Sequence, residues 1–249
     1  MLTSYPRSKR SKLKPRSKRD YIISVIKRVF LVTASLWVVS VLILRFVNPP
    51  ITPLISIRAV EYLLNDKPML RGWSWLPLNK IPLQVQQAVV AAEDARFMEH
   101  WGVDLSAVGA ALEDSDARMK PRGASTITMQ TVKNVFLWPG RSYIRKIIEG
   151  VMAPLAEVVW GKRRTLEIYL NVIEWGEGIY GIEAAAQHYF NCSAQQLTLE
   201  QSAALAAILP APRRLSPKRL SSVSQRRFYR IVKEARAVPL PVSFTRVQR

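Results

Sequence analysis

An uncharged apolar stretch near the N-terminus restricts the fold of this chain more than any other feature. Residues 29–44 contain no charged side chain, and residues 21–26 and 46–47 extend the apolar stretch on both sides. At about 1.5 Å per residue, a helix of this length can cross a bilayer core of roughly 30 Å. We therefore expect a transmembrane anchor over residues 21–47.

The charges that flank the anchor predict its orientation. Residues 1–19 hold eight Lys or Arg and no acidic residue, and the formal net charge of the whole chain is +19. Basic flanks stay on the cytoplasmic side, so the domain after Asn48 should lie outside the cytoplasm. A cleaved signal peptide would end at small residues, whereas Arg45 and the pair Pro49-Pro50 follow here. The membrane thus accounts for the basic tail, and no nucleic-acid partner is expected.

Beyond the anchor the apolar residues recur mostly with helical spacing, which predicts a mainly α domain. Helices are expected over residues 83–97, from Ser125 to about Phe136, over 144–159 and over 166–173. Thr198 and Gln201 form a capping-box pattern for a further helix that Pro210 closes. The stretch around residues 60–80 is the one part that could be extended. Residues 221–249 are expected to form a peripheral helix and a loose tail.

This pattern divides the chain into five segments. They are a basic cytoplasmic tail (1–20), the anchor (21–47), a Pro-containing linker (48–60), a catalytic domain (61–215) and a basic C-terminal helix with its tail (216–249).

Cysteine and histidine are too few for a disulfide framework or a zinc site. The chain has one cysteine, Cys192, and two histidines, His100 and His188. Gly176–Gly181 matches the G-x-G-x-x-G pattern, but it follows a helical stretch and not a strand, so a dinucleotide site is not expected. The sequence requires no cofactor and shows no carboxylate cage for a metal ion.

Two glutamates are the strongest candidates for chemistry. Glu93 closes an apolar helix immediately before Asp94, and an apolar wall beside a carboxyl group suits proton transfer. Glu149 follows Arg145 by four residues, the spacing of a surface ion pair, but the helix around it is apolar nearly all round. A glutamate with two cations beside it, Arg145 and Lys146, is a better functional candidate than a solvated pair.

The segment between these glutamates is rich in groups that suit an anionic ligand. Thr126, Gln130 and Lys133 are spaced to share one helix face. Ser125, Thr126 and the free N–H groups of the helix start predict an anion site. Lys133 supplies a point charge, and Arg141 and Arg145 supply paired donors for phosphate oxygens. A base, a second carboxylate and a cation cluster together favour transfer of a sugar from a phosphate-linked donor.

Four motifs in order give this chain its resemblance to a known family. They are EDARFMEHWGVD (93–104), GASTITMQTVKN (123–134), RKIIE (145–149) and LEIYLN (166–171). The sequence resembles the family 51 glycosyltransferases and, with one anchor and no room for a transpeptidase, its monofunctional peptidoglycan transglycosylases. The resemblance covers roughly residues 60–215. It implies a lysozyme-like domain of two lobes, one facing the inner membrane, that polymerises lipid II in cell-wall synthesis.

The resemblance also assigns roles. Glu93 would deprotonate the 4-hydroxyl of the acceptor, and Glu149 would assist near the leaving pyrophosphate of the undecaprenyl-linked donor, with inversion. Four cations would hold the pyrophosphate, namely Lys133, Arg141, Arg145 and Lys146. Four polar residues would position the donor, namely Ser125, Thr126, Gln130 and Asn134. His100 and Asp104 would shape a loop. A divalent cation could accompany the pyrophosphate, and other cell-wall synthesis proteins could be partners.

Departures from the family pattern leave the catalytic groups in place. Ala124 replaces a glycine, Met129 replaces a glutamine, and residues 113–116 add acidic side chains. Two other functions remain open: a lysozyme-like lytic enzyme that cuts glycan, and a membrane scaffold without activity. The cation cluster favours polymerisation, because cutting glycan needs no pyrophosphate site.

Overall fold

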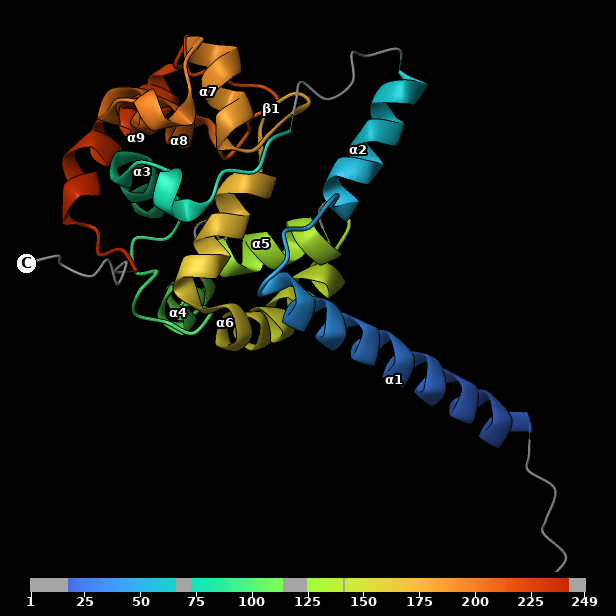
Figure 1. The fold of residues 1–249 in the computed structure, drawn as a ribbon. Helices are drawn as coiled ribbons and strands as arrows, with labels where there is room; N and C mark the ends of the chain where they lie inside the picture. Colours follow the sequence, from blue (N-terminus) through green and yellow to red (C-terminus); the bar gives the residue numbers. More distant parts are fainter. Residues whose placement is uncertain (1–17, 66–72, 114–124, 141, 242–249) are drawn as a thin grey trace, which may run out of the picture. The chain divides into compact units, whose positions relative to one another are not determined.

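The computed structural model describes residues 18–65, 73–113, 125–140 and 142–241, without the side chains of 111–113. Its main helices are α1 (Lys18–Leu44), α2 (Pro53–Leu64), α3 (Leu83–Glu93), α4 (Leu105–Glu113), α5 (Ile127–Phe136), α6 (Tyr143–Val172), α7 (Ile182–Phe190), α8 (Leu199–Ile208) and α9 (Ser222–Glu234) (Figure 1). Short 3₁₀ turns occupy Leu78–Lys80, Ala194–Gln196 and Ala235–Ala237. In the described residues the one sheet is an antiparallel pair, β1 (Glu174–Gly176) and β2 (Ile179–Tyr180). The expectation of a mainly α fold is confirmed.

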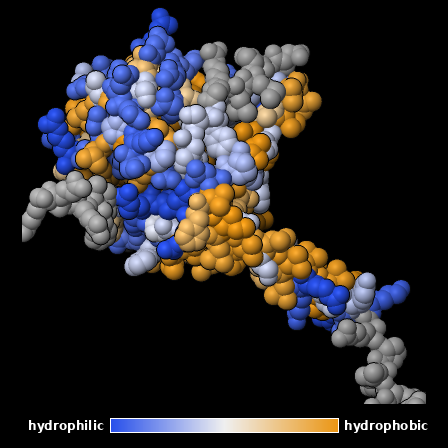
Figure 2. Space-filling view, in the orientation of Figure 1, coloured by the Kyte–Doolittle hydropathy of each residue, from blue (hydrophilic) through white to orange (hydrophobic). Residues whose placement is uncertain are grey.

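The chain divides into two units, residues 1–40 and residues 41–249. The described part of the first unit is most of α1, a helix of 27 residues whose mean hydropathy reaches 2.0. By length and composition it can cross a membrane. Its large apolar side chains are exposed along the helix, Phe30 and Leu31 among them (Figure 2). An exposed apolar surface of this kind is what a bilayer would cover.

The second unit is built around a core of small and branched side chains. Helix α8 is alanine-rich, and it packs between α3 and α9. Alanines allow helix axes to approach closely, so α8 is buried over most of its length. The second part of α6 completes this core with Leu166 and Leu170, and Trp175 of β1 is fully buried beside them.

Helix α6 is interrupted at Gly161, whose φ of 68° and ψ of 168° are not helical. The interruption agrees with the two helices expected over 144–159 and 166–173. The first part lies along α5, the most extensive helix pair in the unit. Its outer side carries exposed apolar side chains, which Figure 2 shows as a hydrophobic surface over α6. They are Ile144, Ile147, Val151, Leu155 and Val158, and we call them the α6 apolar face.

Four local expectations are corrected. Residues 60–64 are helical and not extended, because they complete the amphipathic helix α2, whose Tyr62 is buried. Helix α3 ends at Glu93 instead of residue 97, and Thr126 rather than Ser125 caps α5. The C-terminal helix is not peripheral. Ile231 of α9 is fully buried in the core.

The glycines of the G-x-G-x-x-G pattern belong to the β1–β2 hairpin. A Cβ on Gly176 would lie 2.2 Å from the Tyr189 hydroxyl, and one on Gly181, where φ is 79°, would lie 2.9 Å from the Asn171 carbonyl oxygen. The pattern therefore serves close packing.

Candidate active site

Glu93 lies at the end of α3, where side chains from α5 and α9 contact its carboxylate and one from α6 supports the α5 contact. The amide of Gln130, on α5, donates to Glu93 Oε2 at 2.8 Å. Arg227, on α9, forms an ion pair with Glu93 Oε1 and also donates to the Ala92 carbonyl at 3.0 Å. The hydroxyl of Tyr169, on α6, donates to the other end of Gln130 at 3.2 Å, and burial raises the pKa of Tyr169 well above its usual value. The orientation of the Glu93 carboxylate is thus fixed, and its charge is paired with that of Arg227.

Asp94 ties the end of α3 to the start of α5. Its carboxylate accepts from the backbone N–H of Ile127 at 3.0 Å and contacts His100 Nε2 at 2.9 Å. Asp104 accepts from Ser106 and Ala107 at the start of α4. These contacts agree with the expectation that His100 and Asp104 shape the loop.

The start of α5 is not the open anion site that the sequence predicts. Asp94 occupies the N–H of Ile127, and the Thr126 hydroxyl accepts from Met129 N at 3.1 Å. The same hydroxyl donates to the Gly102 carbonyl. Thr126 is buried and holds the helix start, so this geometry does not favour its direct contact with a donor. Ser125 remains exposed, and Lys146 donates to its hydroxyl at 2.5 Å.

A cation cluster begins at Lys133, about two turns along α5 from Thr126. Lys133 is half-buried, and burial together with the charge of Arg145 lowers its pKa. Burial, Lys133 and Arg145 lower the pKa of Lys146 to about 8. These three cations outnumber the one carboxylate among the described residues that pairs with them, Glu149, so the cluster is suited to binding a further anion. Arg141, the fourth cation of the prediction, lies outside the described residues.

Glu149 is the counter-ion of this cluster. It is 3% exposed, forms an ion pair with Arg145 and lies 3.7 Å from the Nζ of Lys146. The i,i+4 pair is therefore buried rather than solvated. Arg145 also donates to the Gly140 carbonyl at 2.5 Å, which fixes the loop after α5.

A cavity of about 240 Å³ connects these parts. One wall is α5 with the loop that follows it, and it contains Gln130, Lys133, Asn134, Pro139 and Gly140. The facing residues come from α2, from the end of α6 and from the segment 209–212. They are Leu54, Arg58, Tyr169, Ile173, Glu174, Leu209, Pro210 and Pro212. Two lining residues connect the cavity to the groups described above. Gln130 holds Glu93, and the Gly140 carbonyl accepts from Arg145.

Comparisons with known proteins agree with this geometry. Residues 68–236 match the family model described as Transglycosylase. The chain belongs to the transglycosylase family. It is 50% identical over 196 residues to the biosynthetic peptidoglycan transglycosylase of Caulobacter vibrioides, covering 78% of this chain and 82% of that protein. It is 44% identical over 209 residues to the protein of the same name from Pseudomonas syringae pv. syringae, covering 82% and 88%.

Membership confirms the resemblance drawn from the four motifs and the lysozyme-like fold that it implied. It also confirms that the chain is a peptidoglycan transglycosylase, which is a glycosyltransferase activity. The roles of individual residues stay predictions.

Three residues of the site are missing from the sequence prediction. Arg227 contacts Glu93 across 134 positions of chain, so no local pattern links them. Arg58 and Glu174 line the cavity, and the sequence prediction assigned neither of them to the site. Arg58 precedes the family-matched stretch. A local signal existed only for Glu174, which begins the stretch 174–190 that continues the family resemblance.

Proposed function

We propose that this transglycosylase polymerises lipid II by inverting transfer from an undecaprenyl-pyrophosphate-linked donor to the 4-hydroxyl of an acceptor. The observation that supports this most is the arrangement along α5. Gln130 holds the carboxylate of Glu93, and Lys133, three residues later on α5, belongs to the cation cluster. Helix α5 thus contacts the base on α3 and supplies one cation of the site for the leaving anion, and both of these α5 residues line one cavity.

In the proposed step one proton moves to Glu93 and one electron pair leaves with the pyrophosphate. Glu93 takes the proton of the acceptor 4-hydroxyl while that oxygen bonds to the anomeric carbon of the donor. The bond from the anomeric carbon to the phosphate oxygen breaks, and its electron pair leaves with the lipid pyrophosphate. Lys133, Arg145 and Lys146 stabilise the charge that develops there, because fixed cations in a partly dry site need no reorganisation. Glu149 keeps Arg145 and Lys146 in place for this role.

Contacts with the donor follow from the same geometry. Gln130 and Asn134 line the cavity, and Ser125 is exposed beside Lys146. We assign donor positioning to these three residues, with Arg141 as a further cation by family resemblance. A divalent ion, where one takes part, would bind the pyrophosphate itself.

The membrane topology is also part of the proposal. The basic tail stays in the cytoplasm, α1 crosses the inner membrane, and residues after Asn48 lie outside the cytoplasm. The folded unit begins at Val41, whose carbonyl accepts from Trp160 of α6 at 2.9 Å. The α6 apolar face is an exposed apolar surface, and we propose that it contacts the membrane, where a lipid-linked donor resides.

The test is polymerisation of labelled lipid II in detergent by the wild type and by Glu93→Gln. We expect polymer from the wild type and a rate at least about 100-fold lower from the variant, which keeps the shape of Glu93 but cannot act as a base. Cleavage of preformed glycan without polymerisation would support the lytic alternative. Inactivity of the wild type in both assays would support the scaffold.

A second comparison tests the cations. We expect Lys133→Ala to weaken the binding of a pyrophosphate-linked donor far more than the binding of a glycan that lacks pyrophosphate. Equal losses on both ligands would contradict the proposed role of the cluster.

A further inference from the structure

Helix α2 supplies one wall of the cavity, although it precedes the family-matched residues 68–236. The helix is firmly held. Leu54 and Ile55 pack against Tyr180 of the hairpin, and the Tyr62 hydroxyl donates to Glu174 Oε1 at 3.1 Å. The cavity wall formed by Leu54 and Arg58 is therefore a fixed part of the second unit.

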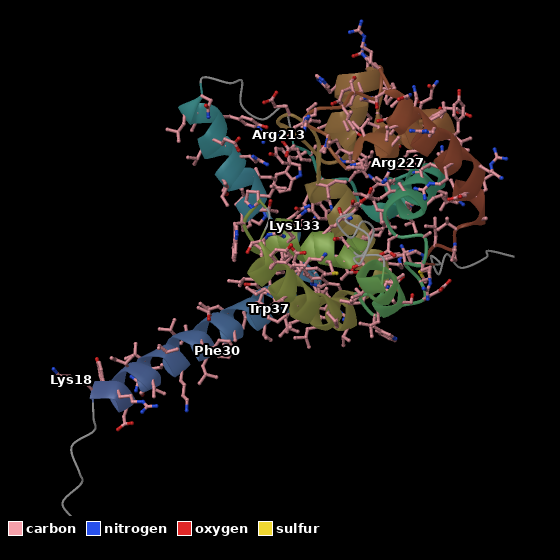
Figure 3. All side chains as sticks on the ribbon, turned by 180° about the vertical axis from the view of Figure 1, so that it is seen from behind. Lys18, Phe30, Trp37, Lys133, Arg213 and Arg227 are labelled. Carbon is pink, nitrogen blue, oxygen red and sulfur yellow. The ribbon has the colours of Figure 1, made fainter. Side chains whose placement is uncertain are left out.

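Arg58 and Glu174 present an unmatched donor and an acceptor at this wall. The Nε–H of Arg58 is buried and has no hydrogen-bond partner among the described residues. It lies 3.7 Å from Glu174 Oε2, too far for a hydrogen bond. Arg213 repeats the arrangement on the other carboxylate oxygen, with its Nε 3.8 Å from Glu174 Oε1 and also without a partner. In Figure 3 Arg213 lies between α2 and the body of the second unit.

An ion-pair network alone does not account for these positions. Glu61 already pairs with both arginines and is partly exposed, whereas Glu174 is 9% exposed and lines the cavity. Burial raises the pKa of Glu174 despite the two guanidinium groups near it. Buried donors left unpaired are costly, and a ligand that pairs them recovers that cost.

We propose that Arg58 and Glu174 bind a secondary amide of the donor, with Glu174 accepting its N–H and Arg58 donating to its carbonyl oxygen. A secondary amide offers one donor and one acceptor side by side, which matches the pair. The inference rests on the proposed function, because a donor built from lipid II carries such amides in two places. One is the acetamido group on each sugar ring, and the other is the attached peptide.

A free amine at the same position fits less well. It has no carbonyl oxygen to accept from Arg58, and its positive charge adds to those of Arg58 and Lys133, which outnumber the one carboxylate among the described lining residues, Glu174. An amide should therefore be selected over an amine, and the selection should depend on this wall. Arg58 and Glu174 act as specificity-determining residues in this proposal, while Glu93 and the cation cluster carry the reaction.

The experiment uses lipid-linked glycans whose terminal 4-hydroxyl is blocked, so that they serve only as donors, with lipid II as acceptor. Three donors are compared: the intact compound, one de-N-acetylated on the ring next to the pyrophosphate, and one without the peptide. The full-length wild type in detergent should show a KM about tenfold or more higher for one altered donor than for the intact one. The altered donor that loses affinity identifies which amide is bound.

Two variants then connect the preference to the wall. Arg58→Lys keeps the charge that pairs with Glu61 but loses the planar donor fork, and Glu174→Gln keeps the shape. In both, the preference for the amide should fall to within about threefold, with little change in KM for the acceptor. Glu177→Gln is the matched control, because Glu177 also lies near Arg213, at 3.8 Å, but does not line the cavity. It should keep the wild-type preference.

Thermal unfolding of each variant identifies a variant that fails to fold. An unchanged preference in folded Arg58→Lys and Glu174→Gln would overturn the proposal. So would a wild type that polymerises lipid II but treats all three donors alike. A wild type that makes no polymer would instead contradict the proposed function.

Discussion

Arg227 should hold Glu93 in the position from which it acts as a base. The guanidinium pairs with the Glu93 carboxylate, and the two side chains are 23% and 12% exposed. Removing a hydrogen bond to a charged group in such a place costs about 1.5–3 kcal/mol. At about 1.4 kcal/mol for each factor of ten, Arg227→Ala should lower the rate of polymerisation by about ten- to a hundredfold.

The reason for the loss is geometric. Arg227 also donates to the Ala92 carbonyl at 3.0 Å, so its guanidinium fixes the Glu93 carboxylate at the end of α3. Without Arg227 the carboxylate keeps the bond from Gln130 alone, and fewer of its orientations reach the acceptor hydroxyl. The loss should appear in kcat more than in the KM for the donor, since Arg227 is not among the residues that line the cavity.

The assay is the rate of lipid II polymerisation at increasing concentrations of the donor. Arg227→Lys keeps a cation that can contact the carboxylate and should lose less activity than Arg227→Ala. Arg226→Ala removes an exposed charge from the same helix and controls for net charge. A folded Arg227→Ala variant that keeps the wild-type kcat would refute this reasoning.

Two further predictions concern the cation cluster and the loop beside it. Lys146 is half charged at about pH 8, and the charged form should bind the pyrophosphate, so the KM for the donor should rise as the pH passes 8. Lys146→Arg, which stays charged, should flatten that rise, and an equally steep rise in the variant would assign the effect to another group. Gly102→Ala should destabilise the second unit by about 2 kcal/mol or more, because φ is +83° and the new Cβ would lie 2.8 Å from the Ala153 backbone. Thermal unfolding should show this loss, whereas Gly109→Ala, with open space around its Cβ, should leave the midpoint unchanged or slightly higher.

The parts of this site that depend on near neighbours in sequence were predictable. Helical spacing placed Gln130 and Lys133 on one side of α5, and it placed Arg145 beside Glu149. The capping box at Thr198 is present, with both of its hydrogen bonds. These features depend on contacts within one or two turns, which the sequence displays directly.

The errors have physical causes. Ser125 and Thr126 are both good N-cap residues, and only the tertiary bond from Thr126 to Gly102 selects the second one. The basic helix α9 has the composition of a solvated surface helix, and its one inward-facing arginine is visible only once α3 and α9 pack together. Arg58 meets Glu174 across more than a hundred residues. Contacts of that kind carry no local sequence signal.

The break in α6 explains how one helix serves both ends of the reaction. Its first part carries Arg145 and Glu149, and its second part carries Tyr169, which reaches Glu93 through Gln130. The two halves of a straight helix are held in line by the helix itself. At the break at Gly161, other contacts must fix the angle between the two parts.

A buried ion pair provides that link. Glu157, just before Gly161, pairs with Lys162, just after it, at 2.5 Å. Glu157 also accepts from Thr128 of α5, and Lys162 donates to the His100 carbonyl and lies 4.3 Å from the centre of the Phe97 ring. Breaking a buried pair by removing one partner costs about 3–5 kcal/mol, since the other charge is left uncompensated. The pair therefore fixes the angle at Gly161 together with the loop that follows Glu93, and through them the separation of the base from the cations.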